Sequence, residues 1–126
     1  MKLSTAIRRG CEMSDDLAGA LLILNPGKRP CACALGAAFL AVAGDWKCKE
    51  ALKLAEDPTT REEAWDLIDT HLSLVFGDVL EEVRVPVDKL HGGKEWVSLR
   101  EAIIHRNDDL QCARGDIADY VMACGC

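Results

Sequence analysis

Apolar residues recur at helical spacing most clearly in the middle of the chain. A Thr-Arg-Glu-Glu capping box at 60–63 predicts the start of a helix there, and Gly77 predicts its end. The apolar stripe between them consists of Trp65, Ile68, Leu72, Val75 and Phe76. Charged residues occupy the opposite side, which is typical of a helix that packs one face against a core.

Four further segments carry weaker forms of this pattern. We expect helices over residues 3–13, 47–56, 98–106 and 113–123. Ser4 is the expected N-cap of the first of these helices, and Ser98 begins a second capping box. The polar run 107–109 is expected to end the helix before it. Asp108 or Asp109 is expected either to cap the last helix or to form an ordinary turn.

Residues 33–43 form a run that is apolar on every side, and such a helix belongs in the middle of a core. Gly44 is expected to end it in the left-handed conformation, and Gly36 among alanines would let a neighbouring helix approach closely. The patterns together predict a mainly α fold. It is a compact bundle of about five to six helices around this central helix, in one domain spanning residues 1–126.

Two segments are ambiguous by pattern. The apolar run 20–24 precedes the turn sequence Asn-Pro-Gly, so a short β-hairpin near 20–33 or a helical turn would fit. In 79–87, Val83, Val85 and Val87 alternate as in a strand, whereas Leu-Glu-Glu at 80–82 favours a helix. Residues 91–94, which include His91, are expected to form a loop.

Composition supports a globular protein and narrows its partners. Of the 126 residues, 49% are hydrophobic and 29% are charged, which is enough apolar material for a core without disulfides. The net charge of −6 is uneven, because residues 1–53 carry 8 Lys/Arg and 5 Asp/Glu, whereas residues 54–126 carry 7 and 16. The acidic second half argues against nucleic-acid binding. It suits either a protein partner with a basic surface or a solvated surface, including that of a homodimer.

The start of the chain lacks the apolar segment of a signal peptide, and the longest apolar run, 31–44, is too short to span a bilayer. We therefore expect a cytoplasmic protein that makes no use of a membrane. The seven cysteines are then expected to be reduced thiols.

The cysteines allow a metal site as one hypothesis. Two Cys-x-Cys pairs, Cys31 with Cys33 and Cys124 with Cys126, could together hold zinc or copper if the end of the chain folds back onto the central helix. Zinc sites more commonly use Cys-x-x-Cys pairs, and free cysteine commonly packs as a small apolar residue. Packing without a cofactor is therefore the favoured interpretation.

A thiol-dependent site is a second hypothesis. Cys33 is expected near a helix N-terminus, His105 could serve as its base, and Asn107 or Asp108 could orient that base. The apolar surroundings of Cys33 would raise the pKa of its thiol instead. A helix-turn-helix over 98–123 is disfavoured, because Arg114 is the one basic residue that its second helix offers.

Three stretches carry a resemblance to a known group: LSTAIRRG at 3–10, CALGAA at 33–38 and IIHRNDDLQCARGDIADYV at 103–121. They resemble small, uncharacterised phage and prophage proteins with a Leu-Ser-x-Ala-Ile-Arg start, a Cys-Ala-Leu-Gly-Ala segment and an Ile-x-His-x-Asn-Asp motif. The resemblance covers about a quarter of the chain. The sequence departs from the group's pattern at Arg106, Cys112, Ala113, Gly115 and Tyr120.

The resemblance implies a small, mostly helical protein of phage or mobile-element origin in a bacterial host cell, and it brings no established activity. Its His105-x-Asn107-Asp108 motif is a possible site, or a network that ends a helix. We therefore expect a non-enzymatic phage or prophage accessory protein that binds a host or phage protein. An inhibitor of a bacterial defence system is one such protein. The alternative is a Cys-based metal-binding or thiol-dependent protein.

Overall fold

The computed structural model describes residues 1–17, 22–23, 29–89 and 91–126. The fold is mainly α, as predicted. Its α-helices are α1 (Leu3–Met13), α2 (Ala34–Val42), α3 (Asp45–Glu56), α4 (Arg61–Gly77), α5 (Leu99–Ile104) and α6 (Arg114–Ala123). Two π-helical turns continue helices, namely η1 (Asp78–Glu82) after α4 and η2 (His105–Asp109) after α5. The strands are β1 (Asp15–Asp16), β2 (Leu22–Ile23), β3 (Cys31–Ala32), β4 (Arg84–Asp88) and β5 (Lys94–Ser98).

The central helix is α2, and its residues 34–40 are all buried. Its closest neighbour is α1, which crosses it at Gly10. A Cβ at Gly10 would lie only 1.8 Å from the carbonyl oxygen of Ala37, so no larger residue fits without moving a helix. The buried central helix is therefore confirmed, and the close approach that the structure shows depends on Gly10 of α1.

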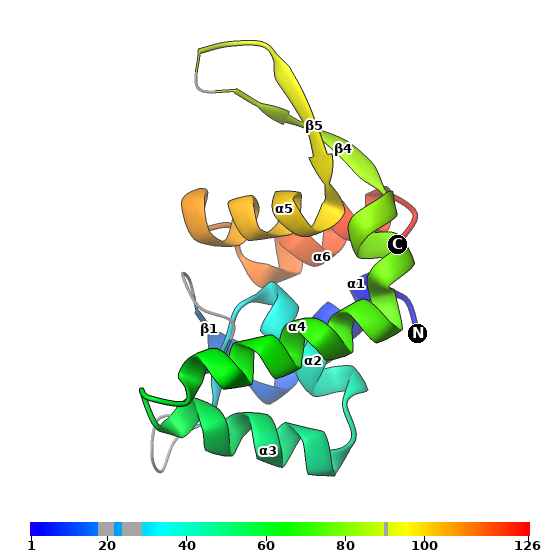
Figure 1. Cartoon of the computed structure of the whole chain (residues 1–126). Helices are drawn as coiled ribbons and strands as arrows, with labels where there is room; N and C mark the ends of the chain where they lie inside the picture. The colour runs from blue at the N-terminus through cyan, green and yellow to red at the C-terminus, as the bar shows by residue number, and fades with distance from the viewer. Residues whose placement is uncertain (18–21, 24–28, 90) are drawn as a thin grey trace.

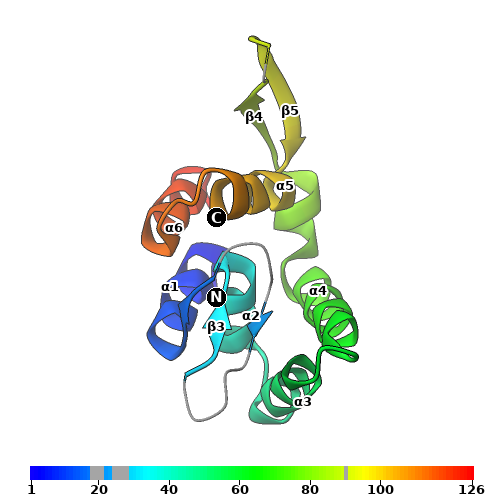
Figure 2. The same cartoon turned by 90° about the vertical axis from the view of Figure 1, so that its left-hand side faces the viewer.

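The other helices cover α1 and α2 from two sides (Figures 1 and 2). On one side α5 and α6 form a layer, and on the other α4 packs on α2 while α3 packs on α4. The core joins buried side chains from each of the helices α1 to α6, namely Ile7, Phe39, Ala51, Ile68, Ile103 and Ile117 among others. Among the described residues, no helix is both long enough and apolar enough to cross a membrane.

Two small sheets accompany the helices. In the first, β3 lies between β1, which is parallel to it, and β2, which is antiparallel. The antiparallel pairing of Leu22–Ile23 with Cys31–Ala32 agrees with the hairpin expected near 20–33. The Asn-Pro-Gly turn at 25–27 lies outside the described residues.

The second sheet is the hairpin β4–β5, which projects from the helical body beyond α5 (Figure 1). The ambiguous segment 79–87 thus contains both structures, a helical turn to Glu82 and then a strand. Val85 and Val97 face each other in the hairpin and are buried at its base. Trp96, paired with Pro86, stays 65% exposed. The sequence of the partner strand β5 does not alternate apolar and polar residues, so no pattern predicted this strand.

Several predicted helix ends are wrong in detail. Ser4 lies buried inside α1, whose N-cap is Lys2, and its amide donates to the carbonyl of Cys126 at 3.2 Å. The last residue of the chain therefore supplies the acceptor that a Ser4 cap was expected to supply. Gly44 has a φ of −67° and is the N-cap of α3, so it does not adopt the left-handed conformation.

The two capping boxes differ. Ser98 accepts a hydrogen bond from the amide of Glu101, as predicted. Thr60 occupies the N-cap position of α4, but its hydroxyl donates to the carbonyl of Leu54 at 2.7 Å. Residues 107–109 continue α5 as the turn η2, and the first turn of α6 has no side-chain cap, so the capping role expected for Asp108 or Asp109 is also wrong.

Candidate functional site

The two Cys-x-Cys pairs lie at different ends of α1. Asp15, just after α1, pairs with Cys31 where β1 runs parallel to β3, whereas the amide of Ser4, in the first turn of α1, donates to the carbonyl of Cys126. The 11 residues of α1 rise by about 16 Å from one end of the helix to the other. Within the residues that the structure describes, no three His, Cys, Asp or Glu side chains form a group that could hold a metal ion. Cys31, Cys33, Cys124 and Cys126 are therefore not assembled into one ligand set.

Cys33 is the N-cap of α2, and its sulfur accepts a hydrogen bond from the amide of Gly36 at 3.4 Å. Burial raises the pKa of Cys33 to about 11, although the backbone hydrogen bonds from Gly36 and Leu35 oppose this. Less than about one thiol in a thousand is then a thiolate at neutral pH. The geometry suits a helix cap better than a nucleophile.

Asn107 is the motif residue that binds the start of α2, next to Cys33 in the chain. It is buried, and its side-chain oxygen accepts a hydrogen bond from the amide of Ala34, the first residue of α2, at 3.0 Å. Its Nδ2 donates to the carbonyl of Leu17 and to a carboxylate oxygen of Asp108, both at 2.9 Å. Asn107 thus joins η2, the segment after β1 and the start of α2, and it satisfies an amide that every helix N-terminus leaves open.

His105 turns to another partner. Its Nδ1 lies 2.8 Å from a carboxylate oxygen of Asp109, one helical turn further on. Asp108 accepts from Asn107, so the predicted residues His105, Asn107 and Asp108 take part in two separate hydrogen-bonded pairs. His91 is exposed between the two strands of the hairpin. The motif therefore does not end the helix, because its residues continue α5 as η2, and Asn107 instead caps the start of α2.

Arg114 completes the polar cluster in the interior. It is only 7% exposed, and its guanidinium donates to the hydroxyl and carbonyl of Ser14, each at 2.8 Å, and to the carbonyl of Ala32 at 3.2 Å. A carboxylate oxygen of Asp16 lies 2.5 Å from its Nε, without the angle of a good hydrogen bond. The one basic residue that the second helix of a helix-turn-helix would offer to DNA is thus enclosed by the fold.

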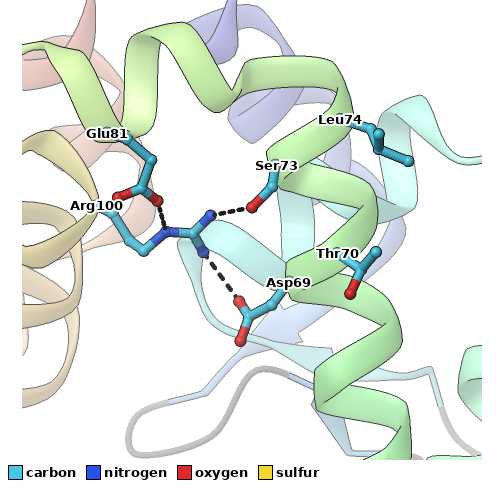
Figure 3. A pocket seen from close by; sticks show the side chains of 6 residues that line it. All are labelled: Asp69, Thr70, Ser73, Leu74, Glu81 and Arg100. Atoms are coloured by element: carbon cyan, nitrogen blue, oxygen red, sulfur yellow. Dashed lines mark hydrogen bonds and ion pairs between the residues drawn. The ribbon is translucent and has the colours of Figure 1, made fainter.

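A second arginine, Arg100, organises a pocket on the surface (Figure 3). Its Nε donates to Glu81 at 2.6 Å, and its two terminal nitrogens donate to Asp69 and to the Ser73 hydroxyl, each at 3.0 Å. Leu74 and Thr70 complete the lining, and Figure 3 shows the side chain of Leu74 pointing away from the Arg100 cluster. Leu74 is 77% exposed and its neighbour Val75 is 46% exposed, although Val75 was expected in the core.

The surface around this pocket is acidic. Residues 61–82 carry seven Asp/Glu and one basic residue, Arg61, whose Nε donates to the carbonyl of Ala55. We call these carboxylates with Leu74 and Val75 the acidic surface; its carboxylates are Glu62, Glu63, Asp66, Asp69, Asp78, Glu81 and Glu82. Burial raises the pKa of Asp69, Arg100 acts in the opposite direction, and Asp66 and Glu81 raise the pKa further. Arg100 therefore contacts two of the seven carboxylates but offsets only one negative charge, and the other five carboxylates stay available.

The sequence offered no signal for Arg100. Its partners Asp69 and Glu81 lie 31 and 19 residues away, and only the packing of α5 on η1, the turn that continues α4, brings them together. The sequence predicted the charged outer face of α4. It did not predict that Leu74, beside this face, is exposed.

Comparison with known proteins does not assign a function to this site. No protein-family model, no curated protein and no solved structure matches the chain. The resemblance to phage and prophage proteins stays a prediction.

Proposed function

We propose that this protein is a non-enzymatic accessory protein of a phage or prophage, which acts in the bacterial cytoplasm by binding a protein partner with a basic surface. A component of a bacterial defence system is a candidate partner. The observation that carries the proposal is Leu74, which is 77% exposed within the acidic surface of α4 and η1.

The combination of exposed apolar and acidic residues supports this choice of partner. Leu74 and Val75 offer an apolar contact, and the carboxylates of residues 78–82 follow directly in η1. Apolar contacts at the centre of an interface supply most of its affinity, whereas charges at the rim guide the approach of the partner and exclude wrong ones. A partner segment with an apolar residue flanked by Lys or Arg would match both features.

The catalytic alternatives receive less support from the geometry. Cys33 is protonated and buried, and the His105 ring nitrogen that makes a hydrogen bond faces Asp109. Asp69, the acidic residue of the pocket with a raised pKa, is held by Arg100. Binding is therefore the function that these groups serve best.

Affinity capture from a bacterial host tests the proposal with two matched variants. Leu74→Lys replaces the exposed apolar side chain of the acidic surface by a positive charge, whereas Met13→Lys makes the same kind of replacement at the exposed end of α1. We expect the wild-type protein and Met13→Lys to retain the same partner, and Leu74→Lys to lose it. Salt should weaken the retained complex, because rim charges are screened.

A purified candidate defence complex, mixed in equimolar amount and followed by gel filtration, gives the direct form of the same test. Co-elution that is lost only in Leu74→Lys would support the proposal. Equal capture by all three proteins, or turnover of a substrate without any bound partner, would refute it.

A further inference from the structure

A second pocket lies on a different side of the molecule, between the hairpin and η2. The hairpin bends back above α5 in Figure 1 and stands upright above α5 in Figure 2. Beneath it, Pro86 and Val87 of β4 face Arg106 and Leu110 across a pocket of about 440 Å³. That volume lies within the usual range for ligand sites and is large enough for several side chains of a bound segment.

Cations gather at this pocket, although the half of the chain that forms it is acidic. Lys89, Lys94 and Arg106 line it, against one lining carboxylate, Asp88, so these four groups sum to +2. Asp88 lies 3.6 Å from Lys94, and both side chains are well exposed to water, so this pair is weak. His105 also lines the pocket and is paired with Asp109.

The remaining basic groups of this half are in part occupied elsewhere. Arg100 is bound to Asp69 and Glu81, and Arg114 is enclosed beside Asp16. Arg106 differs from both, because its guanidinium carbon lies 3.8 Å from the centre of the Tyr120 ring. A cation held over an aromatic face is fixed in place and keeps its charge, so Arg106 is prepared for an anionic ligand.

Apolar groups lie beside these cations. Leu110 is 55% exposed at the pocket, and Pro86 is exposed on the hairpin opposite it. A free phosphate or other small anion would leave these apolar surfaces uncovered. An extended peptide with acidic and apolar residues would meet both.

We propose that the pocket between the hairpin and η2 binds an acidic peptide segment of a partner protein. Its carboxylates contact Lys89, Lys94 and Arg106, and an apolar side chain covers Leu110. This surface is opposite in charge to the acidic surface of α4 and η1, and it goes beyond the proposed function, since the two surfaces bind different chemistry and do not depend on each other.

Fluorescence anisotropy with a labelled synthetic peptide tests this inference on the full chain. The probe alternates pairs of Glu with single Leu residues, and the comparison peptide replaces Leu by Ser. We expect the first peptide to bind with a dissociation constant between about 1 μM and 1 mM and to bind better than the second. Its affinity should fall steeply toward about 1 M salt, where the Debye length is about 3 Å.

Charge reversal on the hairpin provides the decisive comparison. Combining Lys89→Glu with Lys94→Glu should weaken binding about tenfold or more, because both positions are exposed and line the pocket. Lys49→Glu combined with Lys53→Glu makes the same change in net charge on α3 and should leave binding unchanged. Leu74→Lys should also leave it unchanged, which separates this test from that of the proposed function.

Three results would overturn the inference. One is the absence of measurable binding at millimolar peptide. Another is an equal loss of affinity in the hairpin and α3 double variants, which would mean that net charge alone attracts the probe. The third is a dimer in light scattering that only the hairpin variant abolishes, because the pocket would then hold a second copy of this chain.

Discussion

Arg114 and Arg100 both hold several partners, yet they bind different kinds of group. Arg114 is enclosed at the meeting point of α6, β3 and the end of α1, and two of its acceptors are backbone carbonyls, those of Ser14 and Ala32. The acceptors of Arg100 are all side chains, and the carboxylates among them are about half exposed. Backbone acceptors cannot leave without unfolding, whereas exposed side chains can change partners. The first arginine therefore maintains the fold, and the second maintains a surface that a ligand can reorganise.

The largest effect is expected from Arg114→Met. It removes three hydrogen bonds in the interior, although the Ser14 carbonyl keeps another donor, Arg29 at 3.4 Å. Breaking such a buried polar network costs about 3–5 kcal/mol of the free energy of unfolding. Urea denaturation measures the loss. Arg8→Met, which breaks the exposed pair of Arg8 with Asp119, should cost less than about 1 kcal/mol. Similar values for the two variants would contradict the enclosed role of Arg114.

Asn107→Ala should rank next. It removes the acceptor for the Ala34 amide and the donor to the Leu17 carbonyl, and each unsatisfied buried group costs about 1–3 kcal/mol. The same denaturation experiment applies. His105→Ala, two residues earlier, loses only a half-exposed pair with Asp109 and serves as the control. A larger loss of stability in His105→Ala than in Asn107→Ala would mean that the pair of His105 with Asp109, and not Asn107, is the stabilising part of the motif.

Arg100→Met should change stability by about 1 kcal/mol or less, because its partners are half exposed and can be hydrated instead. Its main effect should be electrostatic. Without Arg100, which holds down the pKa of Asp69, that pKa should rise further above its ordinary value. Carbon-detected NMR titration of the carboxyl group measures this. An unchanged pKa of Asp69 together with a large loss of stability would mean that Arg100 stabilises the fold, as Arg114 does.

Alkylation at about pH 8 extends the comparison to the cysteines. Since burial raises the pKa of Cys33 to about 11, Cys33 should react with iodoacetamide more slowly than the partly exposed Cys31, two residues away. Time-resolved peptide mass spectrometry gives both rates in one sample. Fast, selective modification of Cys33 would restore the hypothesis of a thiol-dependent protein.

The smallest effect concerns His71 of α4, whose ring packs edge-on against Phe39 of α2 with the centroids 5.6 Å apart. Burial lowers the pKa of His71, and Lys47 lowers it further, while the Val42 backbone opposes this. Below pH 6.5 the unfolded chain takes up a proton that the folded protein resists, so stability should fall as pH falls from that value. His71→Phe should flatten this part of the stability curve, measured by thermal unfolding. If stability falls equally steeply with pH in His71→Phe, the pH dependence arises from other groups.

Much of the helical fold was predictable, because local spacing decides which residues form a helix and which face it buries. The stripe through Ile68 and Leu72, the run 34–40 and the Ser98 cap all behave as their sequence indicates. Val75 departs from the pattern, because α4 ends in non-helical backbone at Phe76 and the following turn η1 changes direction.

Features that depend on distant partners were not predictable. Asn107 accepts from Ala34, 73 positions earlier, and Arg114 binds Ser14, 100 positions earlier, so no local pattern contains either contact. The strand β5 forms because β4 lies beside it, and the Cys126 carbonyl meets Ser4 because the two chain ends meet.

By itself, the sequence determined the helices, their buried faces, the buried central helix and the excess of negative charge in the second half. Only the tertiary structure decided which polar residues are enclosed and which are available. It placed Arg114 and Asn107 inside, set Arg100 beside Leu74 on an acidic surface, and brought Arg106 to the same pocket as Lys89 and Lys94 of the hairpin. The physical reason is that helical periodicity is a local property, whereas burial and electrostatic neighbours arise only when distant segments pack together.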